Sequence, residues 1–554
     1  MQEVASENLD HYGLVAAVCK DLGIAEKINK ALGPGDPQRQ VSAGISVVAM
    51  ILNGLGFTNR RLYLTPQFFA NKPVEKLLGK GIQASMLTAD TLGKTLDEIS
   101  KYGVSKLFAT VAFAIAVEQG LLSNRNHLDS TSMSVQGRYA DDPEAGAIAI
   151  THGYSKDHRP DLKQVMLSLV VNGPAEIPIW MEAQDGNSSD KESFHKTIKS
   201  VRDFQGQLSV DTDFKWVADS ALYSKNQLLS QNDYLWLCRV PETVKEAKLL
   251  VHTPTEDIDW TLKENGYQIA SFISNYGDIA QRWLLVYSEQ AYQREQKTFE
   301  RKLLKQQEKL EKELGRLKRE TFQCEADALK AVKPLIKRYS LFNLSLKPQA
   351  IQQYPLAGRP KAASKKITVG YCLVGDAESN QVAIDKALNA KGRFIIATND
   401  LDTERLSNTQ MLREYKAQQA PERGFRFFKD PWFMVDSIFL KSAKRIQALM
   451  MVMTLCLLVY NVAQYKLRHS LEVDDDTLPN QLNKPVTNPT MRWIFQLMEG
   501  ISIVRISSAL PQDPLQLFIT NLTELRKKII LLFGPTAASI YHLIPDTHDL
   551  GLAM

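Results

Sequence analysis

Five short runs rich in β-branched and aromatic residues lie between residues 121 and 240, and they constrain the fold more than any other stretch. The first run, 127–136, is followed by the runs 165–172 and 177–183, which a Gly-Pro turn at Gly173–Pro174 joins. Two further runs, 214–220 and 234–240, come after longer intervals. This pattern of strands, with helices between the later ones, predicts an α/β or an α+β fold.

Two of these runs carry an acidic residue where a strand would end or be interrupted. Asp129 lies in the first run, and Asp219 lies near the end of the fourth; a serine follows each. A carboxylate in this position is typical of a strand that carries it to the rim of a sheet. We therefore expect both side chains at one edge of the predicted sheet.

A third acid lies far downstream, in the segment 405–430. Glu422 has a tyrosine seven residues before it and a lysine seven residues after it. Seven residues are close to two helical turns, so one stripe is expected to carry Tyr415, Gln418, Glu422, Arg426 and Lys429. Such a stripe suits an acid that holds a metal ion among phosphate-binding groups. It also suits a solvated helix face with ordinary ion pairs.

The same segment carries signals for where its helix begins and bends. Ser407 and Gln410 have the spacing of a capping box, which predicts a helix start. Pro421 lacks an N–H and disfavours helix in the residue before it, so it predicts either a kink or a new turn with proline at its first position. Either outcome would displace the stripe. Core packing on the back face is expected of Phe425, Phe427, Phe428, Trp432 and Phe433.

These three acidic segments resemble the DDE transposases of bacterial and archaeal insertion sequences. In one branch of that family the third acid lies in a signature of Tyr, two residues, Arg, three residues, Glu, six residues and Lys. Tyr415, Gln418, Glu422 and Lys429 stand at these spacings, with Gln418 in place of the arginine. Glutamine can donate to a phosphate oxygen but brings no charge. The resemblance covers the catalytic parts, 121–240 and 393–470.

The resemblance implies a ribonuclease H-like catalytic core with a large insertion and helical N- and C-terminal regions. Asp129, Asp219 and Glu422 would hold Mg²⁺, for which Mn²⁺ can substitute, because these cations prefer hard oxygen ligands. Tyr415, Gln418, Arg426 and Lys429 would contact DNA. The site would cut the ends of an insertion sequence by hydrolysis and join the 3′-hydroxyl to target DNA. The partners implied are the terminal inverted repeats, target DNA and a second copy in a homodimer.

Two other functions remain open at this point. One is a non-catalytic DNA-binding protein derived from a transposase. The other is a ribonuclease H-like nuclease without a strand-transfer step, which would use the same acids. The presence of all three acids favours an enzyme over the first alternative.

The segment 151–164 combines basic and hydroxyl side chains around a turn. Lys156, His158 and Arg159 are the residues expected to contact DNA, because lysine, arginine and backbone N–H groups are common phosphate contacts. His152 and His158 lack the spacing of a zinc site on a helix or finger. An ordinary surface turn is the alternative.

Composition limits the class of protein and its compartment. The 554 residues are 44% hydrophobic and 23% charged, with a formal net charge of +5, which predicts a soluble multidomain protein whose DNA surface depends on local clustering. Five scattered cysteines and a polar start predict reduced thiols and no secretory signal. The apolar run 446–463 contains Gln447, Thr454 and Asn461, which favours a buried helix over a membrane span. We expect a cytoplasmic, prokaryotic protein that associates with the nucleoid when bound to DNA.

Five regions are expected along the chain. Residues 1–120 form a helical region whose first two helices have the pattern of a helix-turn-helix that would bind DNA ends; an ordinary helical hairpin is the alternative, and Arg60 and Arg61 add a little charge. Residues 121–240 and 393–480 form the two parts of the core, and 481–554 form a helical C-terminal region. The insertion, 241–392, combines a sheet with the charged segment 289–333, where Leu303, Leu310, Leu314 and Leu317 predict a long helix or helical hairpin. A second basic cluster comprises Arg359, Lys361, Lys365 and Lys366.

Overall fold

The computed structural model describes residues 3–35, 37–57, 62–139, 145–208, 214–228, 233–355, 365–430, 440–507 and 516–544. It divides the chain into two compact units. The first, here called the core unit, comprises Met1–Cys238 and Arg413–Met554, and the second, the inserted unit, comprises Arg239–Leu412. Six residues singled out in the sequence lie outside the described residues: Arg60, Arg61, Arg359, Lys361, Trp432 and Phe433.

The sheet of the core unit has the strand order β4-β3-β2-β5-β6. All five expected strands form: β2 (Arg125–Val135), β3 (Lys163–Asn172), β4 (Ile177–Gln184), β5 (Lys215–Ala218) and β6 (Trp236–Arg239). β2, β3 and β4 pair antiparallel, whereas β5 pairs parallel with β2 and β6 parallel with β5. The mixed α/β class expected from the sequence is therefore confirmed.

Helix α15 (Gln419–Phe428) packs on β2 and β3, and α16 (Ala443–Val473) packs on α15 and β4. The close packing depends on Gly424, where a Cβ atom would lie 2.9 Å from Leu457 of α16 and 3.7 Å from Leu169 of β3. The expected buried back face is present, since Phe425, Phe427 and Phe428 are all buried. These contacts fix the height at which α15 crosses the sheet.

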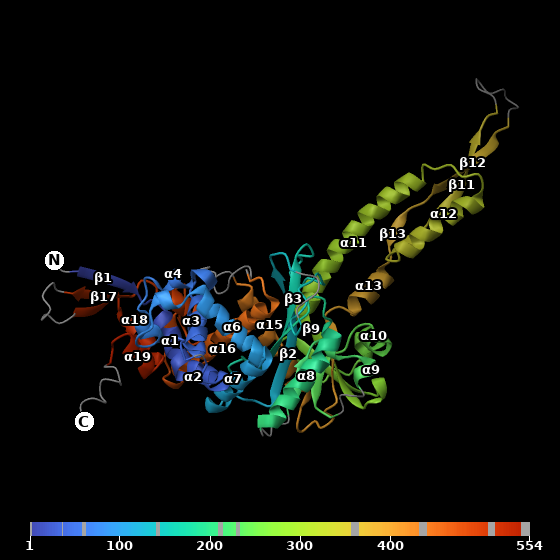
Figure 1. Ribbon diagram of the computed structural model, residues 1–554. Coiled ribbons are helices and arrows are strands. Elements are labelled where there is room, and N and C mark those ends of the chain that lie inside the picture. The colour runs from blue at the N-terminus through green and yellow to red at the C-terminus, as the bar shows by residue number, and fades with distance from the viewer. Residues whose placement is uncertain are drawn as a thin grey trace. The chain divides into compact units, whose positions relative to one another are not determined.

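Helix α16 is the one helix in the described residues that is long and apolar enough to cross a membrane. Its most apolar 18-residue window is 78% buried within the protein. Figure 1 shows the helix lying among helices of the core unit, and it contacts α1, α3, α6 and α7 as well as the sheet. The structure thus agrees with the expectation of a buried core helix.

The N-terminal region is mainly helical and surrounds α16. Its longer helices are α1 (Tyr12–Asp21), α2 (Ile24–Leu32), α3 (Ala43–Gly54), α6 (Ala89–Tyr102) and α7 (Val104–Glu118); the short ones are α4 (Thr65–Phe69) and α5 (Val74–Leu78). Gly23 joins α1 to α2 with a positive φ of 59°, a conformation that glycine adopts without strain.

The sequence predicted helical N- and C-terminal regions, but both regions also contain β-strands. Strand β1 (Glu3–Asn8) pairs with β17 (Ser502–Ser507), which also pairs with β18 (Gln516–Thr520). The prediction missed this sheet because its strands are short and because β1 lies at the opposite end of the sequence from β17. The other C-terminal elements are α17 (Met491–Leu497), α18 (Glu524–Leu532), α19 (Pro535–Ile540) and the strand pair β15 (Leu478–Pro479) and β16 (Pro485–Val486).

The inserted unit contains two kinds of substructure. Strands pair antiparallel in the order β14-β9-β8-β7, namely β14 (Arg393–Thr398), β9 (Gln281–Ser288), β8 (Tyr267–Ser274) and β7 (Leu262–Glu264). The sequence predicted a sheet in the insertion, but β12 (Ile367–Val374) is not part of the sheet that contains β9; it pairs with β11 (Lys347–Gln353) instead. Two smaller strands, β10 (Phe342–Leu344) and β13 (Ala377–Ser379), form another pair.

The charged segment forms a helical hairpin, one of the two structures expected for it. α11 (Glu289–Leu317) and α12 (Glu325–Arg338) lie side by side in Figure 1 and share a small apolar core. That core contains Leu310, Leu314, Val332 and Leu335, and Leu303 and Leu317 pack against it. The remaining helices of the described residues in this unit are α10 (Lys245–Val251) and α13 (Gln381–Asn389).

Candidate active site

Strands β2 and β5 place two of the predicted acids next to each other. Their parallel register sets Leu128 opposite Ala218, so Asp129 and Asp219 follow at the same level of the sheet. One carboxylate oxygen of Asp129 accepts a hydrogen bond from the Ser130 N–H at 2.7 Å. Asp219 caps the short helix η3 (Ser220–Leu222) and accepts from the Ala221 N–H at 2.8 Å. Backbone donors thus orient both carboxylates.

Asp129 lies in an environment that disfavours its negative charge. Burial raises the pKa of Asp129 from 3.8 to about 7, and the charges of Asp219 and Asp190 act in the same direction. Lys156 and the Ser130 N–H oppose this shift. A buried carboxylate that faces two others is stabilised when a cation binds beside it.

Asp190 is a site residue that sequence reasoning missed. It is the first residue of helix α8 (Asp190–Leu208), and its carboxylate accepts hydrogen bonds from the Ser130 hydroxyl and from Lys156. An acid at a helix N-terminus has an ordinary structural explanation, and no spacing connects it with Asp129. The only sequence signal was the run Asn187-Ser188-Ser189-Asp190 ahead of the helix, which marks its start.

Lys156 lies beside these acids, and its ammonium group is part of the site. The Lys156 ammonium donates to the Ser130 carbonyl at 2.7 Å, to the Ser130 hydroxyl at 2.9 Å and to Asp190 at 3.1 Å. The Lys156 backbone N–H also donates to the Ser132 hydroxyl at 2.9 Å. The turn 151–164 is therefore tied to β2 at the level of Asp129, and Lys156 supplies positive charge to the acidic cluster.

Glu422 lies in the first turn of α15 and is exposed. The capping box forms as predicted, with reciprocal hydrogen bonds between Ser407 and Gln410 at the start of α14 (Asn408–Lys416). The single continuous stripe does not form, because α14 ends at Lys416 and α15 starts at Gln419. Pro421 falls in the first turn of α15, where a backbone N–H has no partner within the helix.

The break between the helices turns Gln418 inward, away from the stripe. Its amide donates to the Leu128 carbonyl at 2.7 Å, and its carbonyl oxygen lies 3.3 Å from Nδ1 of His127. Gln418 is only 8% exposed. Tyr415 lies on the preceding helix and is half-buried, whereas Glu422 and Arg426 remain on the exposed face of α15.

The other predicted cations are placed around the turn 151–164. Lys429, the residue that ends α15, forms an ion pair with Asp157. Arg159 is exposed and donates two hydrogen bonds to Asp161, at 2.9 and 2.8 Å. His158 is exposed and has a positive φ of 57°, an uncommon conformation for a residue other than glycine. Lys429 thus contacts this turn at Asp157, the residue that follows Lys156.

The carboxylate oxygens of Asp129 and Asp219 are the type of ligand that a hard divalent cation prefers. Asp129 and Asp219 offer carboxylate oxygens at adjacent strand positions, and burial, with a smaller effect from Asp219, raises the pKa of Asp129. Within the described ranges, no group of three or more His, Cys, Asp or Glu side chains lies close enough together to hold a metal ion. Glu422 is thus not gathered with the two aspartates into one compact donor set.

The cysteines are not part of this site. All five are free, with Cys19, Cys238 and Cys456 buried, Cys324 exposed and Cys372 half-buried. Burial raises the pKa of the Cys19, Cys238 and Cys456 thiols, so these side chains behave as small apolar groups.

Comparisons with known proteins give a match to a family model and similarity to solved structures. Residues 4–113 match a family model described as a domain of unknown function, DUF4277. No curated protein matches the chain. Among solved structures, the chain is similar to the piggyBac transposase in a synaptic complex with hairpin DNA, at 10% identity and a TM-score of 0.37. That alignment covers 100% of this chain and 90% of the other.

Proposed function

We propose that this protein is a DNA transposase whose core unit has a ribonuclease H-like sheet. The observation that carries the proposal is the register of β2 and β5, which sets Asp129 and Asp219 side by side. Three antiparallel strands and two parallel strands in the order β4-β3-β2-β5-β6 support it. The third acid, Glu422, is on a helix that packs on β2 and β3.

In this proposal, Asp129, Asp219 and Glu422 hold Mg²⁺, with Mn²⁺ as a substitute. The bound cations would activate the attacking oxygen and stabilise the leaving oxygen during phosphoryl transfer on DNA. Glu422 is exposed on α15, and the proposal requires its side chain to approach the aspartates when DNA and metal bind. Lys156 keeps Asp129 and Asp190 from repelling each other until then.

The DNA contacts divide between the exposed face of α15 and the turn 151–164. Arg426, Lys429, His158 and Arg159 are exposed and reach solvent on these elements, and Tyr415 completes the set on α14. Gln418 is not among them, because both ends of its amide are used inside the protein. Gln418 therefore does not take over the phosphate-binding role of the arginine that the family signature has at this position.

The proposal also includes partners and location. The DNA partners are the inverted repeats at the ends of an insertion sequence and the target DNA. Strand joining at two ends requires at least a homodimer, and the protein would act in the cytoplasm of a prokaryotic cell. Short inverted repeats on both sides of the gene would support this assignment directly.

The test is strand cleavage by the Asp129→Asn variant on labelled DNA carrying the flanking repeats, with Mg²⁺ or Mn²⁺. We expect cleavage to fall by at least about a thousandfold, because amide oxygen and nitrogen replace a charged metal ligand. DNA binding measured without metal should change little. The matched control is Asp203→Asn, which removes an exposed carboxylate from α8.

Each outcome of this assay decides between the candidate functions. Undiminished cleavage by Asp129→Asn would refute the catalytic assignment. Binding without cleavage by the unmodified protein would instead favour a non-catalytic DNA-binding protein. Cleavage without joining of the 3′-hydroxyl to a second duplex would favour a nuclease.

A further inference from the structure

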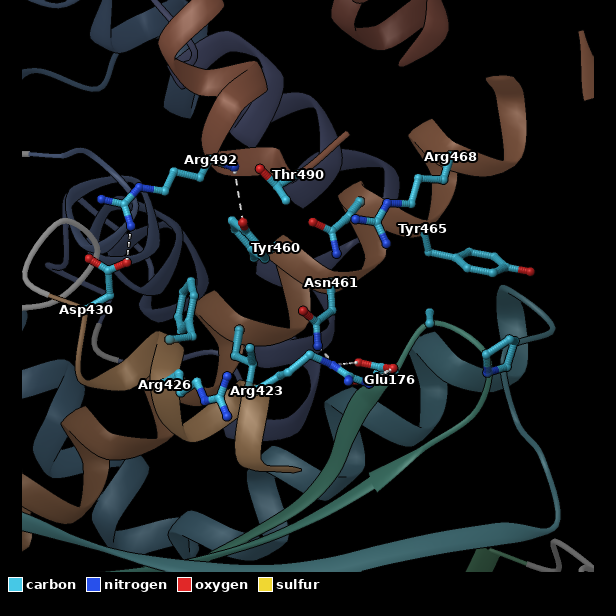
Figure 2. A pocket seen from close by; sticks show the side chains of 15 residues that line it. Glu176, Arg423, Arg426, Asp430, Tyr460, Asn461, Tyr465, Arg468, Thr490 and Arg492 are labelled. Atoms are coloured by element: carbon cyan, nitrogen blue, oxygen red, sulfur yellow. Dashed lines mark hydrogen bonds and ion pairs between the residues drawn. The ribbon is translucent and has the colours of Figure 1, made fainter. Parts of the chain in front are cut away.

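A cavity of about 640 Å³ opens beside α15, on the side that includes Arg423 and Arg426. α16, the β3–β4 turn at Pro174–Glu176 and the start of α17 form its other walls. Figure 2 shows arginine side chains reaching into it from these different elements. All of its lining residues belong to the core unit.

Positive charge dominates the lining of this cavity, here called the arginine pocket. Four arginines and two carboxylates line it: Arg423, Arg426, Arg468, Arg492, Glu176 and Asp430. Neutral hydrogen-bonding side chains complete the lining: Tyr460, Asn461, Gln464, Tyr465 and Thr490. Such a surface favours an anion, because it carries four guanidinium charges and only two carboxylate charges.

The arginines are held in place by different partners. Arg423 donates to Glu176, and Arg492 donates to Asp430 at 2.6 Å. Arg468 donates to the Pro489 carbonyl at 3.0 Å and the Asn488 carbonyl at 3.3 Å, neither of which carries a charge. The Arg426 side chain forms no hydrogen bond or ion pair within the described ranges. Neither Arg426 nor Arg468 is therefore paired directly with a carboxylate.

The electrostatics of Arg468 agree with this count. Burial lowers the pKa of Arg468, Tyr460 and Glu176 act in the opposite direction, and the charge of Arg423 lowers the pKa further. A half-buried guanidinium near a second one is stabilised by an anion between them. Guanidinium groups also match phosphate oxygens in geometry, because their planar forks donate two parallel hydrogen bonds.

The position of the pocket relative to Glu422 indicates a polymer as the ligand. Arg426 follows Glu422 by four residues on the exposed face of α15, which corresponds to about 6 Å along a helix axis. A strand that passes Glu422 would therefore meet Arg426 and the pocket within one or two phosphates. Tyr465 lies at the edge of the pocket, where its ring stacks on His469.

We propose that the arginine pocket binds the sugar-phosphate backbone of DNA next to the strand held at Glu422. This assignment rests on the proposed function for its choice of DNA over other polyanions. It adds Arg423, Arg468 and Arg492 to the DNA-contacting residues and gives α16 and α17 a part in holding substrate.

The first test measures loss of binding by the full-length protein in EDTA. Fluorescence anisotropy with a labelled duplex should show that Arg426→Gln binds about tenfold more weakly at low salt. The slope of log affinity against log salt should also fall by about 0.9, the value for one phosphate contact. Lys199→Gln, which removes an exposed charge on α8 away from the pocket, is the matched control and should leave both quantities nearly unchanged.

The second test measures gain of binding, which a misfolded variant cannot imitate. Glu176→Gln removes the carboxylate that holds Arg423, and Asp430→Asn does the same for Arg492. Each variant should bind the duplex more tightly and with a steeper salt slope. Weaker or unchanged binding by both variants would overturn the proposal.

Competition separates DNA from a small anion as the ligand. Inorganic phosphate should displace the duplex only at concentrations that also act through general salt screening. If phosphate protects the protein from heat while no variant changes duplex binding, the pocket binds a small anion and the proposal fails. Because these measurements need neither metal nor cleavage, absence of strand cutting would count against the proposed function and leave the pocket assignment standing.

Discussion

Gln418 fixes the junction between α14 and α15 on the buried strand β2. Its side-chain amide donates to the Leu128 carbonyl, so its oxygen is left to accept from Nδ1–H of His127. Burial lowers the pKa of His127 to about 4, which keeps the ring neutral and able to hold that proton. One side chain thus ties the Glu422 helix to the strand that carries Asp129.

We predict that Gln418→Ala lowers the free energy of unfolding by about 1–3 kcal/mol, because two buried polar groups lose their partner. Urea denaturation followed by circular dichroism would measure the change. Gln419→Ala removes the exposed amide of the next residue and should change stability far less. An equal effect of the two substitutions, or a stable Gln418→Arg variant with stronger DNA binding, would contradict the structural role of Gln418.

The sequence predicted the positions of Asp129 and Asp219 on the sheet more successfully than the helix stripe, for a physical reason. Strand partners follow from runs of apolar residues, and the parallel register then brings the ends of β2 and β5 together. The position of Gln418 depends on how α14 and α15 pack on the sheet. The 3.6-residue helical period carries no information about this packing. Lys156 and Asp190 meet only through the tertiary fold, since 34 residues separate them.

At the level of elements, the hairpin of α11 and α12 depends on a small apolar core within a highly charged segment. Leu310 and Leu314 are 1% and 5% exposed, whereas Leu304 on the same helix is 60% exposed. The spacing of the leucines predicted the buried stripe because a charged helix has few other apolar groups. The choice between one long helix and a hairpin depended on the turn at 318–324, which no strong signal marks.

We predict that Leu314→Ala destabilises this hairpin by about 2–5 kcal/mol, the usual range when a buried leucine is truncated. Hydrogen exchange of the backbone amides between residues 289 and 338 would show faster local opening. The Leu304→Ala variant provides the control, because its side chain is already exposed. Similar exchange rates in the two variants would show that the hairpin core contributes little.

At the level of the whole molecule, the two ends of the chain close the core unit together. Strand β1 pairs with β17, and the Tyr541 hydroxyl donates to the Asp10 carbonyl. His11 stacks on Phe495 with ring centroids 4.4 Å apart, and its Nε2 lies 2.9 Å from the Leu55 carbonyl. Sequence patterns did not predict this closure, because its contacts join residues nearly the full length of the chain apart.

We predict that acid weakens this closure through His11. Burial lowers the pKa of His11 from 6.5 to about 4, so the unfolded state takes up protons first as the pH falls. Stability from this group is therefore complete above pH 6.5 and decreases between that value and about 4. Thermal unfolding over this range should show a smaller loss of Tm in His11→Gln than in the unmodified protein.

The control for this prediction is His252→Gln, which replaces an exposed histidine of the inserted unit. It should leave the slope of Tm against pH unchanged, although His11→Gln lowers Tm at neutral pH through lost packing. Parallel slopes for all three proteins would show that His11 does not couple protonation to folding.

The interrupted path of the core unit has a consequence for synthesis on the ribosome. Glu422 emerges about 200 residues after Asp219, which at roughly 5–20 residues per second corresponds to a delay of about 10–40 seconds. During that interval the nascent polypeptide contains Asp129 and Asp219 but lacks Glu422, α15 and α16. Under the proposed function, a growing chain therefore cannot assemble its metal-binding site until Glu422 has been added.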